Sequence, residues 1–390
     1  MVLYFTDSDS LPGHVDLFAL GDRFLPRILS YAFGIHVLLT FTINGLSYAL
    51  AGSQSYSDVF SITNTIVVLP FFCWILNLLA VFGRRLVDPF VSILTLFKGT
   101  LLLIVVVIAF IVGSTIQKEI TNDFHYIADS FLTATVALGG TFLTMPYMFT
   151  KISFSEPDVR YYRLAITLGM VTCYVLETLW CWAVLDVVPQ VDACLSIDYT
   201  NTSTTGCLPP GYTLQSAEEN GEISTVPFSR VLDDSYPMYS WVGTVISVFI
   251  MISITVSYTF NSTVLCQTVE GVVSSVWRIS WNRCDFKLAS SEVIVAIAAN
   301  FFLMTVIFVV ALFNPQSFVI IVSKAMSIAN NFGVGFYISI MMWRCTGKNF
   351  QYLEIPLPLS KFQVKLQYLV SVFFMLATVW GVVSWILESI

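Results

Sequence analysis

The sequence predicts an all-α polytopic membrane protein with nine transmembrane helices. Its 390 residues are 56% hydrophobic and only 11% charged, which leaves too few charges to cover the surface of a soluble domain. Nine apolar stretches are each long enough for a helix to cross about 30 Å of hydrocarbon. They cover residues 28–51, 58–83, 89–116, 129–150, 163–188, 238–272, 290–313, 317–342 and 366–388. The sixth stretch is over-long, which indicates a tilted helix or one that continues into water.

The distribution of Lys and Arg predicts how these helices are oriented. With the N-terminus placed in the cytoplasm, 14 of the 18 basic residues fall on the cytoplasmic side, and only Lys118 and Arg230 fall on the other. Such an excess of positive charge is typical of cytoplasmic loops. We therefore expect residues 1–390 to form one transmembrane domain, with a cytoplasmic segment at 1–27 and the C-terminus outside.

The long polar loop 189–237 is predicted to be extracellular or lumenal. It contains seven acidic residues and a glycosylation sequon at Asn201, a modification made on that side of a eukaryotic membrane. Cys194 and Cys207 lie in the same loop and can pair in an oxidising lumen, although sequence alone does not fix connectivity. These features indicate a eukaryotic glycoprotein of the plasma membrane or an endomembrane. The net charge of −7 argues against a nucleic-acid partner.

The fourth apolar stretch, 129–150, is expected to break near its centre. It contains the pair Gly139 and Gly140, and glycine is a very weak helix former. Pro146 removes one more backbone hydrogen bond from the helix interior. Broken backbone at membrane depth is tolerated inside protein or beside a water-filled cavity, where its free polar groups can hold a substrate carboxylate or an ion. A simpler interpretation is that the glycine pair only permits close helix packing.

Several polar residues lie inside the predicted spans. Lys98 is near the middle of the third span, where a charge costs about 2.5–3.5 kcal/mol or more. It is either a cation near a binding site or a side chain that reaches back toward the cytoplasm. The sixth span carries a run of hydroxyls that suits a Na⁺ or substrate site, although such groups also join helices together. This run includes Ser253, Thr255 and Ser257. Asn330 and Asn331 in the eighth span predict an interior-facing polar contact.

No pattern in the sequence indicates an enzyme. The three histidines, His14, His36 and His125, are widely spaced. We find no CxxC, HExxH, GxSxG or P-loop motif. The sequence therefore predicts no catalytic residues, no cofactor and no bound metal.

Six segments, taken in order, carry a resemblance to a known family. They are 82–107 (FGRRLVDPFVSILTLFKGTLLLIVVV), 130–149 (SFLTATVALGGTFLTMPYMF), 162–189, 253–277, 308–325 and the final span. They resemble amino acid permeases of the aromatic/hydroxy branch of the amino acid–polyamine–cation superfamily, which have the LeuT-type fold. The resemblance covers essentially the whole chain, and order and spacing carry it rather than any single motif.

The resemblance implies transport of an amino acid, aromatic or otherwise neutral, by alternating access around the broken helix at 136–146. The substrate-binding positions it implies are Leu138, Gly139, Gly140, Thr141 and Thr144. Lys98 matches a fifth-helix lysine that replaces a sodium ion in several permeases of the superfamily, which implies coupling to H⁺ rather than Na⁺. Ser253, Thr255 and Ser257 are the other ion-coupling positions.

One departure from the family pattern concerns the number of helices. Family members have eleven, in two inverted repeats of five plus one, and the first span here corresponds to their third helix. The chain is then either a fragment of a longer protein or a degenerate relative. Two other functions stay open: a non-transporting receptor or scaffold, and a metal-ion carrier of the same fold. The carrier is disfavoured because no Asp, Met or His cluster lines the broken segment.

Overall fold

The structure is a computed structural model that describes residues 17–62, 64–116, 127–153, 155–191, 194–196, 205–207, 211–220, 222–281, 289–313, 316–347 and 360–388. Its α-helices are α1 (Leu17–Phe24), α2 (Arg27–Val59), α3 (Thr65–Phe82), α4 (Arg84–Ile116), α5 (Ile127–Gly139), α6 (Met145–Phe149), α7 (Glu156–Val187), α8 (Leu214–Glu219), α9 (Thr225–Ser235), α10 (Ser240–Trp281), α11 (Ala289–Leu312), α12 (Gln316–Phe332), α13 (Ser339–Cys345) and α14 (Lys361–Glu388). Shorter irregular helical segments are η2 (Gly140–Leu143), η3 (Pro237–Tyr239) and η4 (Gly333–Ile338). Strands β1 (Cys194–Ser196) and β2 (Thr205–Cys207) pair antiparallel.

Eight helical stretches in the described part of the chain are long and apolar enough to cross a membrane. They correspond to α2, α3, α4, α7, α10, α11, α14 and the run from α12 through α13. The prediction of a helical, multi-pass membrane protein is therefore confirmed. The fourth predicted span, 129–150, is not one continuous α-helix, because it is divided among α5, η2 and α6. Its longest part, α5, has 13 residues, which at 1.5 Å per residue is only about 20 Å.

The predicted boundary between the first two spans is wrong. α2 continues to Val59, eight residues past the predicted end at residue 51, and α3 begins only at Thr65. Three serines of this extension donate their hydroxyl protons to carbonyls three or four residues earlier, so their polar groups are paired within the helix. They are Ser53, Ser55 and Ser57.

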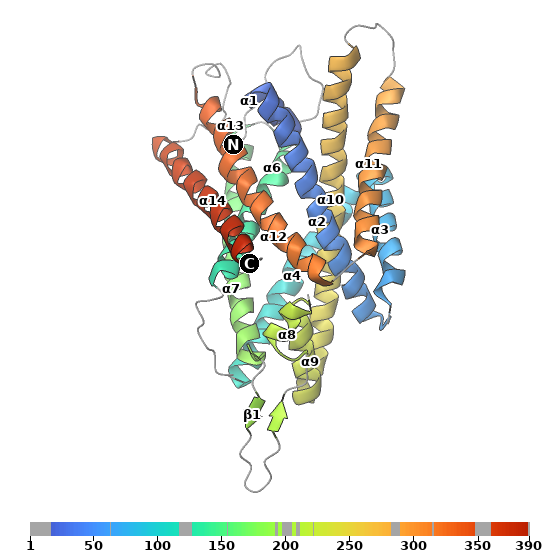
Figure 1. The fold of residues 1–390 in the computed structure, drawn as a ribbon, viewed down its shortest axis with the longest axis vertical. Helices are drawn as coiled ribbons and strands as arrows, with labels where there is room; N and C mark the ends of the chain where they lie inside the picture. The colour runs from blue at the N-terminus through green and yellow to red at the C-terminus, as the bar shows by residue number, and fades with distance from the viewer. Residues whose placement is uncertain are drawn as a thin grey trace.

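Buried apolar side chains form two clusters, and among the described helices α10 contributes to both. Near its N-terminus, α10 places Val242 and Ile246 against α4, α7 and α9. Its middle part places Tyr258 and Leu265 against α2, α3 and α11. α10 has 42 residues, a length of about 63 Å or twice the hydrocarbon thickness. It therefore continues beyond the membrane, as the over-long sixth stretch predicted, and runs beside α2 and α4 (Figure 1).

The predicted outer loop, 189–237, contains secondary structure of its own. α8, α9 and the β-hairpin gather at one end of the helix bundle, and α1 lies at the opposite end (Figure 1). Arg230 of α9 donates two hydrogen bonds of 2.9 Å to the Glu222 carboxylate and one of 3.1 Å to the Gly211 carbonyl. Gly211 has φ of 102°, a backbone conformation that favours glycine. Arg230 thus fastens this turn to α9. Which end faces the cytoplasm stays a prediction.

We predict a disulfide bond across the β-hairpin. The strand register places the Cα atoms of Cys194 and Cys207 opposite each other. Directly opposed antiparallel residues have Cα atoms about 4.5–5.5 Å apart, which lies within the range that a disulfide spans. Mass spectrometry without reductant should show the two peptides linked and resistant to alkylation. The buried free thiol of Cys73 serves as the control because it should alkylate after denaturation. Alkylation of both hairpin cysteines without reductant would contradict the prediction.

Candidate functional site

The helix predicted to break does so at the glycine pair. α5 ends at Gly139, η2 is a 3₁₀ turn that begins at Gly140, and α6 resumes at Met145. The Thr141 carbonyl accepts a bond of 3.2 Å from the Thr144 N–H and one of 3.1 Å from its hydroxyl. Pro146 has no N–H, so the carbonyl four residues earlier, on Phe142, loses its α-helical donor. The backbone is therefore irregular at the point where the sequence predicted it.

The two glycines have different surroundings. A Cβ at Gly139 would lie 2.8 Å from Cε1 of Phe374 on α14, so this glycine permits close helix packing, as the simpler interpretation holds. A Cβ at Gly140 would meet only Nδ2 of Asn330 on α12, at 4.0 Å. The irregular backbone and the close approach of α14 therefore occur at neighbouring residues.

A second irregular helix lies against the first. α12 passes into η4, a π-helical segment that begins at Gly333, before it continues as α13. A Cβ at Gly333 would lie 2.7 Å from Cζ of Phe142 on η2 and 3.0 Å from Nε2 of His36 on α2. The sequence analysis missed this π-helix, although Gly333 and Gly335 flanking Val334 are a signal for it. Single π-turns within α-helices are frequently found at functional sites.

The predicted interior contact of the two asparagines is confirmed. Asn330 and Asn331 are 1% and 0% exposed. Nδ2 of Asn331 donates to Oγ1 of Thr135 on α5 at 2.8 Å, and the Ser327 hydroxyl bonds the Leu132 carbonyl at 3.4 Å. These bonds form a polar seam between α12 and α5. We use this name below for Thr135, Ser327, Asn330 and Asn331.

Lys98 meets one of the predicted hydroxyls. Its Nζ lies 3.4 Å from Oγ of Ser257, so α4 and α10 are joined at this point. The lysine is half-buried rather than fully exposed to lipid. Sequence reasoning had singled out both residues, but their contact depends on how the two helices pack.

The other two predicted ion-coupling hydroxyls do not share this point. Thr255 bonds the Tyr56 hydroxyl of α2 at 2.9 Å, on a different face of α10 from Ser257. Its own proton goes to the Met251 carbonyl at 2.7 Å. Ser253 is half-buried on the same helix. The structure therefore separates Thr255 from Lys98.

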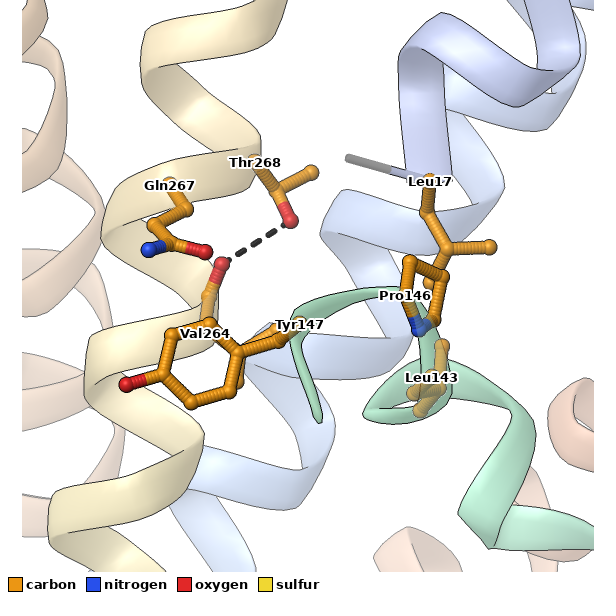
Figure 2. A pocket seen from close by; sticks show the side chains of 7 residues that line it. All are labelled: Leu17, Leu143, Pro146, Tyr147, Val264, Gln267 and Thr268. Carbon is orange, nitrogen blue, oxygen red and sulfur yellow. Dashed lines mark hydrogen bonds between the residues drawn. The ribbon is translucent and has the colours of Figure 1, made fainter. Parts of the chain in front are cut away.

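A small pocket of about 10 Å³ lies beside the break (Figure 2). Its lining comes from α1, η2, α6 and α10, and consists of Leu17, Leu143, Pro146, Tyr147, Val264, Gln267 and Thr268. The Thr268 hydroxyl already donates to the Val264 carbonyl at 2.9 Å. The pocket has room for about one water molecule, far less than the roughly 300–1,000 Å³ typical of ligand sites, so in this conformation the region beside α6 is nearly closed.

Some predicted positions fall outside the described residues or side chains. Asn201 lies outside them, and so do the side chains of Leu138, Cys194 and Cys207. Within the described ranges, no group of three or more His, Cys, Asp or Glu side chains is placed to hold a metal ion.

Comparisons of the chain with models of known protein families and with curated proteins found no match. A function therefore has to be inferred from the residues and contacts described above.

We predict that the two neighbouring glycines respond oppositely to alanine. Gly139→Ala should lower the thermal unfolding midpoint in detergent, because its Cβ would press on the Phe374 ring and overpacking costs about 1–3 kcal/mol. Gly140→Ala should leave the midpoint unchanged or raise it, because Ala favours helical backbone by about 0.5–1 kcal/mol.

A double variant tests whether contact with the Phe374 ring causes the loss of stability in Gly139→Ala. If the Phe374 ring is responsible, Gly139→Ala should cost little in a Phe374→Ala background, and the two changes should not add. Equal losses for the two glycine variants would show that the prediction is wrong.

Proposed function

We propose that the chain is a secondary transporter of amino acids that works by alternating access around η2. The observation that supports this most is the pairing of two irregular helices, α5–η2–α6 and α12–η4–α13, inside an apolar bundle. Backbone that leaves the α-helical hydrogen-bond pattern at membrane depth is characteristic of substrate sites in discontinuous-helix transporters. A LeuT-type bundle is part of the proposal.

In this proposal the residues of the break bind the substrate. Gly140 presents its backbone with little in front of it, since a Cβ there would meet only Nδ2 of Asn330 at 4.0 Å. The Thr144 hydroxyl, which donates to the Thr141 carbonyl, can still accept a hydrogen bond. Groups of this kind suit the carboxylate and amino ends of an amino acid. The nearly closed pocket beside α6 fits an occluded conformation, which opens when α6 moves away from α10.

Lys98 supplies the coupling to protons. As an ammonium it donates a charge-assisted hydrogen bond to Ser257, which joins α4 to α10. Such a bond is stronger than a neutral one by about 1 kcal/mol, so loss of the proton changes the ratio of two conformations about fivefold. An ammonium group at this position also fills the space, and supplies the positive charge, that a bound Na⁺ would otherwise provide. We therefore propose H⁺ as the coupling ion.

Reconstituted liposomes provide the test of this function. The full chain should take up at least one of the neutral amino acids, and an acidic exterior should increase the rate. Lys98→Gln should remove that increase, because glutamine carries no titrating charge. The matched control is Lys365→Gln on α14, an exposed lysine that should behave as the wild type does.

Two results would contradict the proposal in different ways. Unchanged acceleration by protons in Lys98→Gln would remove the coupling role from this residue. No uptake of any amino acid by correctly inserted protein would favour the non-transporting receptor or scaffold instead.

A further inference from the structure

Among the spanning helices of the described chain, α7 is the one that the rest of the molecule covers least. No residue of α7 from 160 to 182 is buried. In the most apolar stretches of the other seven spanning helices, between 22% and 44% of the residues are buried. α7 packs against α4 along its length and against α6 and α9 near its ends. Most of its length therefore has a face without a neighbour.

This face carries a carboxyl group at membrane depth. Glu177 is the only charged residue between Arg163 and Asp186. At 1.5 Å per residue it lies about 21 Å along the helix from the first and about 13 Å from the second, and its side chain is exposed. Acidic residues at this depth are costly and almost always face protein or a water-filled cavity. We therefore expect another molecule, rather than lipid, to cover this part of α7.

Within the described chain, Glu177 has one hydrogen-bond partner. The thiol of Cys173, one turn earlier on α7, donates to Oε1 at 3.4 Å. Lys98 of α4 interacts electrostatically with this cysteine, but its own hydrogen bond goes to Ser257 on α10. A thiol is a weak donor, and a carboxyl group can make several hydrogen bonds. Most of the hydrogen-bonding capacity of Glu177 is therefore unused.

Small side chains accompany Glu177 at every fourth position of the same helix. They are Ala165, Gly169, Cys173 and Cys181, and all of them are exposed. Residues four apart are neighbours on a helix surface. A Cβ added at Gly169 would meet nothing within 4 Å, so this part of the row is open. Rows of small residues allow two membrane helices to approach closely, at a crossing angle of about −40°.

The length of the undescribed segments shows that the cover comes from a second molecule. The longest undescribed stretch within residues 1–390 is 1–16. A helix needs about 20 residues to cross the hydrocarbon. No undescribed part of these 390 residues is therefore long enough to lie along α7 as a further spanning helix.

We propose that this face of α7 is the contact between two copies of the chain. Copies in one membrane share an orientation, so a two-fold axis along the membrane normal places identical residues opposite each other at equal depth. A carboxyl group is then complementary to its own copy, because the protonated form donates a hydrogen bond that the ionised form accepts. The row of small residues is complementary to its own copy in the same way.

Counting subunits in a lipid bilayer tests this contact. The full chain, with one fluorescent label on a C-terminal tag, is reconstituted into liposomes at several protein-to-lipid ratios, and bleaching steps are counted for single particles. Wild-type protein should form dimers whose fraction rises with its density in the membrane. Glu177→Leu should weaken association about fivefold to thirtyfold, the effect of losing one hydrogen bond between membrane helices. Glu177→Gln should still associate, because an amide also donates and accepts.

Gly169→Leu tests the close approach of the two helices. The leucine side chain has open space in the single chain but would hold two copies apart. Dimers should be lost, while the thermal unfolding midpoint of the monomer in detergent should not fall. Ala298→Leu is the matched control, since it enlarges an exposed small residue on α11, another spanning helix. This variant should dimerise as the wild type does.

Two results would overturn the inference. Wild-type protein that stays monomeric at every density would show that a different transmembrane helix, or none, covers α7. Dimers that persist in both Glu177→Leu and Gly169→Leu would place the contact elsewhere on the molecule. Because the subunits are counted without substrate, neither result depends on whether the chain transports amino acids.

Discussion

The packing of α10 against two separate sets of helices is the interaction on which the rest of the structure depends. The N-terminal part of the helix belongs to a core with α4, α7 and α9, and its middle part to a core with α2, α3 and α11. Within the described chain, α10 is the helix whose buried side chains enter both. Any movement of one group of helices relative to the other must therefore take place at a surface of α10.

Polar side chains specify how α10 meets these neighbours. Nδ2 of Asn261 donates to the Phe41 carbonyl of α2 at 3.2 Å, and Thr255 bonds Tyr56 on the same helix. On the side of α4, Nζ of Lys98 donates to Oγ of Ser257 at the long distance of 3.4 Å. The polar contacts described between α10 and α2 are thus neutral, whereas this contact with α4 involves a titratable side chain. For this reason the proposed proton coupling is placed at the surface between α4 and α10.

Sequence predicted the local features well because each depends on residues close together in the chain. The break followed from Gly139, Gly140 and Pro146, all within one span. That Thr255 and Ser257 lie on different faces of α10 could also be predicted, since residues two apart on a helix lie about 200° apart at 3.6 residues per turn. Contacts between residues far apart in the chain could not be predicted from the sequence. The contacts of Lys98 with Ser257 and of Thr135 with Asn331 join residues more than 150 positions apart, and each depends on the packing of whole helices.

The concentration of unpaired acceptors in the polar seam is what separates it from ordinary helix packing. Unpaired amide atoms also occur elsewhere in the described chain, as at Asn77 and Asn300. In the seam they accompany a 3₁₀ turn and a π-helix, both of which have poorer hydrogen-bond geometry than an α-helix. Each unpaired group costs about 1–3 kcal/mol, against a total stability of only about 5–15 kcal/mol for a typical domain. Leucine side chains at these positions would be buried equally well and would leave no polar group unpaired. A seam that is polar, incompletely bonded and flanked by irregular backbone on both sides therefore lowers the stability of the fold, and a role other than stability explains it better.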